Sequence, residues 1–246
     1  TSIISMYLIP DKYTPKILNP VLNGVLFDQR NTNDYVVEYY IKNRGLICYE
    51  LFLQNTNDKA VEWMITHSNK IDFGTFSFNR NDKAVEYLIK NPEKINKSAF
   101  SQNTNDKAVE WLINHPEKIK YFCFSANTND KAVEWLIKHP EKINIYWFSQ
   151  NTNDKAVEWL IKNPEKMEYY GFSSGNTNDK AVDWLIQHSE KINLDLFSGN
   201  TNDKAVEWLL KHPDKITGRI KHNNSHLFYG IDTDKIKILK NSISKY

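Results

Sequence analysis

Five histidines recur at one place of a repeated sequence pattern, and histidine serves in proteins as a metal ligand and as a general acid or base. They are His67, His115, His139, His188 and His212. Stacked helices lie about 8 to 10 Å apart, whereas the ligands of one zinc ion approach within about 4 Å of one another. Other copies of the pattern hold Asn there, and both residue types tolerate unusual backbone at a helix end. We therefore expect a structural role. His222 and His226 lack a third ligand, so no metal site is predicted.

The cysteines and the repeated carboxylates give no sign of catalysis either. Cys48 and Cys123 lie three repeats apart, about 25 to 30 Å on the stacking distance, whereas a disulfide allows only ~7 Å between Cα atoms. We expect free thiols, which suit a reducing compartment. Glu134 recurs identically in other copies, whereas a catalytic pair of carboxylates needs one distinctive environment. With Lys138 four residues further on, Glu134 is expected to form a surface ion pair along one helix.

No glycine-rich phosphate loop and no nucleophile elbow occurs in the sequence. We therefore predict that the protein is not an enzyme, with no catalytic residue and no cofactor. The composition agrees with a globular protein: 246 residues are 40% hydrophobic and 25% charged, with a formal net charge of +2. No apolar run approaches the roughly 18 residues of a membrane span. We expect a soluble, intracellular protein without a membrane partner.

A tandem repeat in the sequence predicts the structural elements that position all these residues. The unit reads N-T-N-D-K-A-V-E-W-L-I-K-(H/N)-P-E-K-I-N-x-x-x-F-S-x, numbered here as positions one to twenty-four. The spacing is 24 residues, except for one spacing of 25 where Ser173-Ser174-Gly175 adds a residue. Copies begin at Asn31, Asn55, Asn79, Asn103, Asn127, Asn151, Asn176 and Asn200. We predict three parts of one continuous domain: a degenerate capping repeat over 1–30, eight repeats over 31–222 and a C-terminal capping repeat over 223–246.

Each unit is expected to form a longer helix and a short one. In the copy at Asn127, this Asn is the expected N-cap, and Pro140 should end the helix at His139. The apolar stripe recurs at helical spacing and consists of Ala132, Val133, Leu136 and Ile137. Position eighteen holds capping residues in most copies, although Cys48, Lys120 and Glu168 break this pattern.

Placing a second N-cap at position eighteen pairs Ile143 with Phe148 as a hydrophobic staple. Helices of about ten and about six residues are marginal alone, so stacking must supply their stability. Leucine-rich repeats share this period, but their strand needs apolar residues in the order L-x-x-L-x-L, whereas Ile and Phe here stand five apart. We therefore predict an all-α fold, an α-solenoid of 24-residue repeats with degenerate capping repeats.

The paired elements N-T-N-D-K-A-V-E-W-L-I and H/N-P-E-K-I-N resemble the Asn-rich short-repeat proteins of giant DNA viruses, whose repeats run S-x-N-P-N-A-I-x-L-L and N-P-D-K-I. The resemblance covers residues 31–216 and departs from that pattern by Thr in place of Pro, as at Thr128. That family carries no established activity. The resemblance implies a viral source and a location in the host cytoplasm or in the virion.

Aromatic residues offer the candidate binding sites. The position-nine tryptophans, such as Trp135, are expected to flank the core and stack along the solenoid, or alternatively to form an exposed track. Position twenty should point away from the core, and contiguous exposed aromatics commonly mark binding surfaces. The alternative is that these rings fill a wedge between layers. The candidate protein-binding residues are Tyr121, Phe122, Tyr146, Trp147, Tyr169 and Tyr170.

We therefore predict a non-enzymatic repeat scaffold that binds a protein partner, from the host or the virion. The alternative is a structural virion or assembly component. Nucleic-acid binding comes third, because the charges are evenly mixed and only the C-terminal end is basic. That end carries Arg219, Lys221, Lys235, Lys237, Lys240 and Lys245. The oligomeric state and the partner's identity stay open.

Overall fold

The computed structural model describes residues 28–67, 69, 71–212 and 215. The chain divides into two compact units, Thr1–Ile95 and Asn96–Tyr246. Every regular element among the described residues is a helix, which confirms the all-α prediction. The long helices of the first unit are α1 (Asp34–Lys42), α3 (Asp58–Thr66) and α5 (Asp82–Lys90). Those of the second unit are α7 (Asp106–Asn114), α9 (Asp130–Lys138), α11 (Asp154–Lys162), α13 (Asp179–Gln187) and α15 (Asp203–Lys211).

Short helices alternate with the long ones. The first unit holds α2 (Tyr49–Phe52) and α4 (Phe73–Phe76). The second unit holds α6 (Lys97–Ser101), α8 (Tyr121–Ser125), α10 (Ile145–Ser149), α12 (Tyr169–Gly175) and α14 (Leu194–Phe197). A single 3-10 turn, which the sequence pattern did not predict, joins most long helices to the short helix that follows: η2 (Arg44–Leu46), η4 (Pro92–Lys94), η5 (Pro116–Lys118), η6 (Pro140–Lys142), η7 (Pro164–Lys166) and η8 (Ser189–Lys191).

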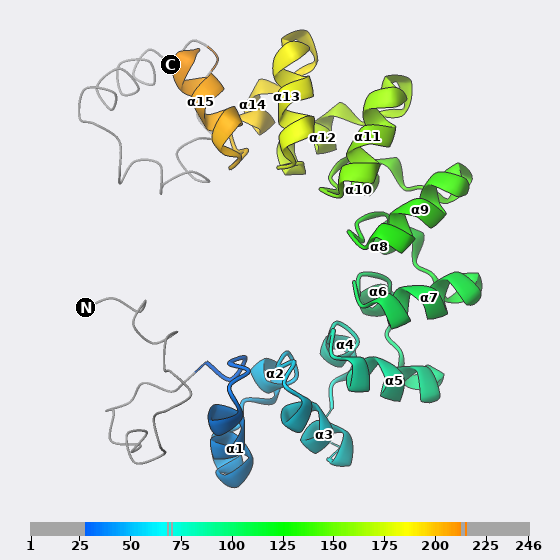
Figure 1. Cartoon of the computed structure of the whole chain (residues 1–246), viewed down its shortest axis with the longest axis vertical. Helices are drawn as coiled ribbons and strands as arrows, with labels where there is room; N and C mark the ends of the chain where they lie inside the picture. Colours follow the sequence, from blue (N-terminus) through cyan, green and yellow to red (C-terminus); the bar gives the residue numbers. More distant parts are fainter. Residues whose placement is uncertain (1–27, 68, 70, 213–214, 216–246) are drawn as a thin grey trace, which may run out of the picture. The chain divides into compact units, whose positions relative to one another are not determined.

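Helices of one kind stack on their own kind. In the second unit α7, α9, α11 and α13 form one row and α6, α8, α10 and α12 form a second row beside it (Figure 1). In the first unit α1 contacts α3, and α3 contacts α5. Within each unit, successive repeats therefore pack against one another in sequence order, which is the packing of an α-solenoid. No helix among the described residues is long and apolar enough to cross a bilayer.

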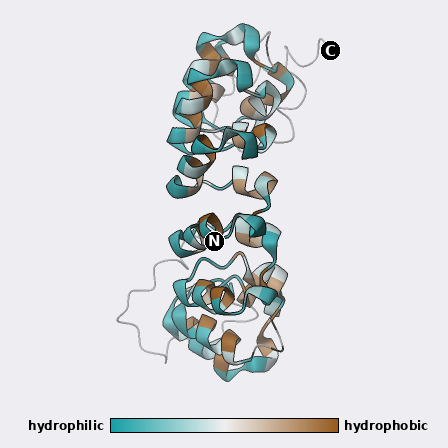
Figure 2. Cartoon of the chain, turned by 90° about the vertical axis from the view of Figure 1, so that its right-hand side faces the viewer, coloured by the Kyte–Doolittle hydropathy of each residue, from teal (hydrophilic) through white to brown (hydrophobic). Residues whose placement is uncertain are grey.

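The core lies between the two rows. Ala132, Val133 and Leu136 of α9 are completely buried, as is Phe148 of α10, whereas Ile137 is half-buried. Figure 2 shows hydrophobic and hydrophilic stretches alternating along the helices, as amphipathic elements require. A buried side chain of this size contributes roughly 1.5 to 3 kcal/mol, and each layer gains this burial only when its neighbours cover it.

The long helix begins two residues later than predicted. Asn129 at position three is the N-cap, and its side chain accepts a hydrogen bond from the backbone N–H of Lys131. Asp130 is thus the first helical residue, where its negative charge favours the positive end of the helix. The prediction that Asn127 caps this helix was wrong, because Asn127 is buried between layers. The predicted end at His139 is confirmed, and Pro140 begins η6.

Position eighteen caps the short helices as predicted, with one difference. The side chains of Asp72, Asn96, Asn144 and Asn193 accept hydrogen bonds from backbone N–H groups of the helices that follow. Glu168, expected to break the pattern, also caps, because its longer side chain reaches Tyr170 N and Gly171 N. Cys48 and Lys120 make no such bond, as expected.

The described part begins inside the predicted N-terminal capping repeat. Gln29 is buried, and its Oε1 accepts a hydrogen bond of 2.8 Å from the backbone N–H of Cys48. Serine at position twenty-three accepts the corresponding bond in later repeats, as Ser125 does from Asn144 N. Gln29 therefore takes the place of this serine. The rest of the predicted capping repeats, up to residue 27 and from residue 223, lies outside the described residues.

Candidate functional site

Within each unit, the asparagine at position one links a repeat to the backbone of the repeat before it. Asn151 is 2% exposed, and its Nδ2 donates to the carbonyl oxygens of Ser125 and Asn127 at 3.0 and 2.9 Å. Its Oδ1 accepts from Asn153 N at 3.0 Å. The same pair of donations joins Asn127 to Ser101 and Asn103. These amides satisfy carbonyl groups that the layers bury, and an unpaired buried carbonyl is costly.

The serine at position twenty-three makes a second link. Ser125 Oγ donates to the carbonyl of Tyr121 and accepts the backbone N–H of Asn144 from the next repeat at 2.9 Å. Ser149 Oγ accepts Glu168 N at 3.0 Å in the same way. Both serines are completely buried. Each one fixes the start of the next short helix.

Charged residues make a third link on the exposed face. Lys155 Nζ lies 2.8 Å from Asp130 Oδ2 and also pairs with Glu134, both in the preceding repeat. Hydrogen bonds to Asp130 and then to Glu134 raise the pKa of Lys155 to about 12. The hydrogen bond from Lys155 is also the main reason that the pKa of Asp130 is lowered. The predicted partner of Glu134, Lys138, makes no ion pair within the described residues. A lysine of the next layer takes its place.

The histidines at position thirteen close the long helices. In His139, Nδ1 lies 2.8 Å from the carbonyl oxygen of Trp135, and the imidazole stacks on that indole with ring centroids 4.1 Å apart. Where position thirteen holds Asn163, its side chain makes the equivalent bond by donating to the carbonyl oxygen of Trp159 at 2.8 Å. The predicted structural role is confirmed for this column. No group of three possible metal ligands occurs among the described residues, and His222 and His226 lie outside them. Cys48 and Cys123 are both free thiols.

The position-nine tryptophans flank the core as predicted, but their stacking partners are other residue types. Trp135 meets the buried Phe124 edge-on with centroids 6.0 Å apart, and its face stacks on Tyr121. Trp63 is buried, whereas Trp135 and Trp159 are half-buried. The column is therefore a packing element, in which the indoles of Trp135 and Trp159 stay partly accessible.

Four of the six predicted binding residues are exposed on three successive short helices. Phe122 of α8 is 47% exposed, Tyr146 and Trp147 of α10 are each 39% exposed, and Tyr170 of α12 is 47% exposed. The rings of Tyr146 and Tyr170 lie 6.4 Å apart, and Trp147 meets Tyr146 edge-on at 5.3 Å. We call these four residues the aromatic patch.

The other two predicted residues, Tyr121 and Tyr169, point to a different place. Tyr121 stacks on Trp135 and Tyr169 stacks on Trp184, each with ring centroids 6.2 Å apart. Both tyrosines are half-buried. They therefore pack between adjacent repeats rather than extending the exposed patch.

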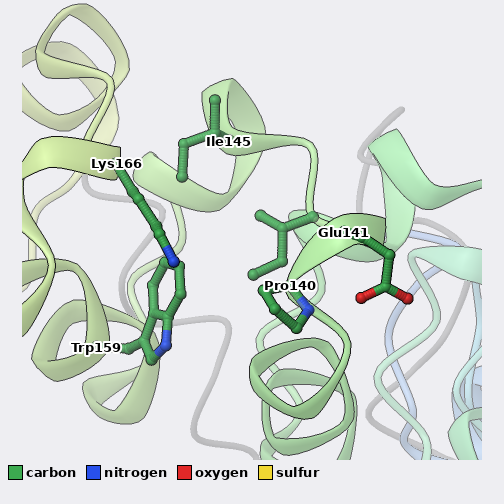
Figure 3. A pocket seen from close by; sticks show the side chains of 6 residues that line it. Pro140, Glu141, Ile145, Trp159 and Lys166 are labelled. Carbon is green, nitrogen blue, oxygen red and sulfur yellow. The ribbon is translucent and has the colours of Figure 1, made fainter.

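Two hollows were not predicted from the sequence. One, of about 430 Å³, lies in the second unit beside Trp159 (Figure 3). It is lined by Pro140, Glu141, Ile143, Ile145, Trp159 and Lys166. The other, of about 440 Å³, lies in the first unit and is lined by Gln54, Asp72, Gly74, Thr75 and Phe78. A signal for the first was present in the sequence, because Ile145 stands at position nineteen where the adjacent repeats hold Tyr121 and Tyr169.

The fold and these links define a class of protein: a helical tandem-repeat protein of the α-solenoid type. No protein-family model, curated protein or solved structure matches the chain. The resemblance to repeat proteins of giant DNA viruses therefore stays a prediction from the sequence.

Proposed function

We propose that the protein is a non-enzymatic scaffold that binds another protein through the aromatic patch. The observation that carries this proposal is the exposure of Phe122, Tyr146, Trp147 and Tyr170 on three adjacent short helices. Exposed Tyr and Trp that become buried on association supply much of the binding free energy in protein interfaces. Helix layers about 8 to 10 Å apart give the patch a length of about 16 to 20 Å.

The composition of the repeat supports a scaffold over an enzyme. Its recurring polar side chains bond to backbone or charged groups of the neighbouring layer, as those of Asn151, Ser125 and Lys155 do. Every aspartate and glutamate with a resolved shift in the described part has a lowered pKa. A general acid at neutral pH would instead need a raised pKa. The residues that remain for recognition are those at the variable positions of the repeat. In the described part of the second unit, the large hydrophobic residues that are exposed are all aromatic.

Polar residues stand at both ends of the patch. Position twenty holds Ser98 before Phe122 and Asp195 after Tyr170. An apolar centre with a polar rim is the usual organisation of a protein interface. The patch therefore fits an apolar ridge or an amphipathic helix of a partner.

Affinity capture with a matched pair of variants tests this proposal. One variant carries Phe122→Ser, Tyr146→Ser and Tyr170→Ser, and the control carries Tyr35→Ser and Phe78→Ser, which change residues that are 44% and 47% exposed in the first unit. We expect the first variant to lose partners that the wild type and the control both capture, while all three keep their melting temperatures. Equal capture by the patch variant would overturn the proposal.

The same variants address an assembly role, in which the partner is a second copy of this chain. Sedimentation of the purified wild type at increasing concentration would then show association, and the patch variant would not associate. The third prediction, nucleic-acid binding, depends on basic residues from Arg219 onward that lie outside the described residues.

A further inference from the structure

The hollow beside Trp159 lies between two successive repeats of the second unit. Pro140 and Glu141 come from η6, Ile145 opens α10, and Trp159 and Lys166 belong to the next repeat. In Figure 3 the Lys166 chain reaches across the indole, while Ile145 and Pro140 lie on the opposite side of the hollow. Lys166 Nζ is 5.2 Å from the centroid of the Trp159 ring.

Two equivalent places in the same unit are filled by a tyrosine of the chain, whereas Lys97 and Leu194 hold this position beside Trp111 and Trp208. Tyr121 stacks on Trp135 at 6.2 Å with an interplanar angle of 12°, and Tyr169 stacks on Trp184 at 6.2 Å and 19°. Both tyrosines occupy position nineteen, and both indoles occupy position nine of the following repeat. The two sites therefore show which ring, in which orientation, fits between these elements.

A lysine and a carbonyl group complete each filled site. Lys142 Nζ lies 5.5 Å from the centroid of Tyr121, and Lys191 Nζ lies 5.6 Å from that of Tyr169, so each phenol ring lies between an indole and an ammonium group. The Tyr121 hydroxyl donates to the carbonyl oxygen of Pro116 at 3.3 Å. In the other site Tyr169 donates to Pro164 at 3.2 Å.

At the hollow beside Trp159 the chain supplies every element of these sites except the tyrosine ring. Ile145 stands at position nineteen and is too short to cover Trp159, and Lys166 lies directly on the indole instead. The carbonyl oxygen of Pro140 accepts Ile143 N at 3.2 Å, as that of Pro116 accepts Ile119 N at 3.2 Å. A carbonyl oxygen has two lone pairs, and at Pro116 the second one receives the tyrosine hydroxyl. Pro140, which lines the hollow, carries the equivalent carbonyl acceptor.

We propose that this hollow binds a tyrosine side chain presented by a partner protein. The phenol ring displaces the Lys166 ammonium group from the Trp159 face and lies between the two, and its hydroxyl donates to the carbonyl oxygen of Pro140. The occupant is a tyrosine because both filled sites of the same geometry hold one, and because Phe lacks the donor that Pro140 would accept. This inference goes beyond the proposed function and does not depend on the aromatic patch, none of whose residues line the hollow.

The probe for a test is N-acetyl-tyrosinamide, a tyrosine residue with both ends capped. It is titrated into the full chain while the indole N–H signals are followed by NMR, with the Trp159 signal identified by its loss in Trp159→Phe. We expect a saturable shift of the Trp159 signal. N-acetyl-phenylalaninamide should bind about threefold or more weakly, because one hydrogen bond is lost.

The decisive variant is Ile145→Tyr, which fills the hollow with the ring that the adjacent repeats place there. It should keep or raise the melting temperature and abolish the shift, whereas the control Leu51→Tyr, which adds a tyrosine at a residue 37% exposed in the first unit, should bind the probe as the wild type does. Three results would overturn the proposal: no shift of Trp159 in the wild type, an undiminished shift in Ile145→Tyr, or equal binding of N-acetyl-leucinamide. Loss of capture by the patch variant tests the proposed function separately, so failure of one leaves the other standing.

Discussion

The side-chain nitrogen of Asn151 lies 2.9 Å from the backbone carbonyl oxygen of Asn127, the residue that occupies the same position one repeat earlier. The relationship recurs from Asn127 to Asn103 and from Asn200 to Asn176. A buried column of amides thus ties each layer to the backbone of its neighbour. The asparagine that opens the repeat motif is an interlayer bond rather than a helix cap.

Replacing Asn151 with Ala should therefore be costly. The change removes the donor of two buried carbonyl groups, those of Ser125 and Asn127. At about 1 to 2 kcal/mol for each group, we expect a loss of about 2 to 4 kcal/mol in the free energy of unfolding. Urea unfolding followed by circular dichroism measures it.

The matched change is Asn153→Ala, which removes the N-cap of α11 and two solvent-exposed hydrogen bonds, to Thr128 O and Asp130 Oδ1. A lost N-cap costs about 1 kcal/mol. If the variant at Asn153 proved the more damaging of the two, the interlayer role of Asn151 would be refuted.

Phe148→Ala should lower the free energy of unfolding by about 3 to 5 kcal/mol, because this completely buried ring leaves a cavity between α10 and the Trp159 indole. Tyr146→Ala on the same short helix changes an exposed ring and should cost less than about 0.5 kcal/mol. Thermal and urea unfolding of the two variants give the comparison. Similar losses in both would contradict the assigned faces of α10.

Gly171→Ala should destabilise the protein although Ala favours helix over Gly by about 1 kcal/mol. A Cβ atom at Gly171 would lie 2.9 Å from the backbone oxygen of Tyr146, so α10 and α12 would have to move apart. Such overpacking costs about 1 to 3 kcal/mol. Gly45→Ala is the control, because nothing lies within 4 Å of a Cβ atom there. A gain in melting temperature for Gly171→Ala would show that the short helices are packed less closely.

Acid should weaken the interlayer ion pairs. The pKa values of Asp106, Asp130 and Asp154 are lowered, chiefly by hydrogen bonds from Lys131, Lys155 and Lys180. A lowered pKa in the folded protein means that the contribution to stability is complete above the ordinary aspartate pKa of about 3.9 and is lost as the pH falls through the folded-state value. Unfolding measured between neutral pH and about pH 2 should show this loss, and salt should reduce it.

The lysines behave in the opposite direction, because the pKa values of Lys131 and Lys155 are raised to about 12. Their contribution is complete below the ordinary lysine pKa of about 10.4 and is lost as the pH rises through about 12. A triple variant with Lys131→Gln, Lys155→Gln and Lys180→Gln should show a smaller dependence on acid. The control with Lys138→Gln and Lys162→Gln should behave as the wild type. A reduced acid dependence in this control would instead support ion pairs between residues four apart on one helix.

The repeat length and the apolar stripe were enough to predict the helix pair. The period of 24 residues places the helices along the chain, and the spacing of Ala132, Val133 and Leu136 identifies the buried face of the long helix. The N-cap was misplaced because Asn127 and Asn129 are equally good caps in isolation. Only the carbonyl groups of the neighbouring layer assign Asn127 elsewhere. The 3-10 turn at Pro140 was missed because Pro140 was treated only as the end of a helix.

The same limit applies to the surface. Position twenty was predicted to point away from the core, with packing between layers as the alternative, and Phe122, Tyr146 and Tyr170 are exposed. The contacts of Glu134 with Lys155 and of Tyr121 with Trp135 were not predicted, because each of them reaches into the next repeat. Local patterns specify a helix face, whereas contacts between layers depend on an offset that only the stacked structure shows.

The interlayer bonds have a direction. In the recurring asparagine, lysine and serine links the donor belongs to the later repeat and the acceptor to the earlier one: Asn151 reaches back to Asn127, Lys155 to Asp130, and the Asn144 backbone to Ser125. A chain leaving the ribosome N-terminus first therefore exposes the accepting side of one layer before the donors of the next have been made. Within each unit, every newly synthesised repeat meets a template that is already complete, so the solenoid is suited to fold in step with its own translation.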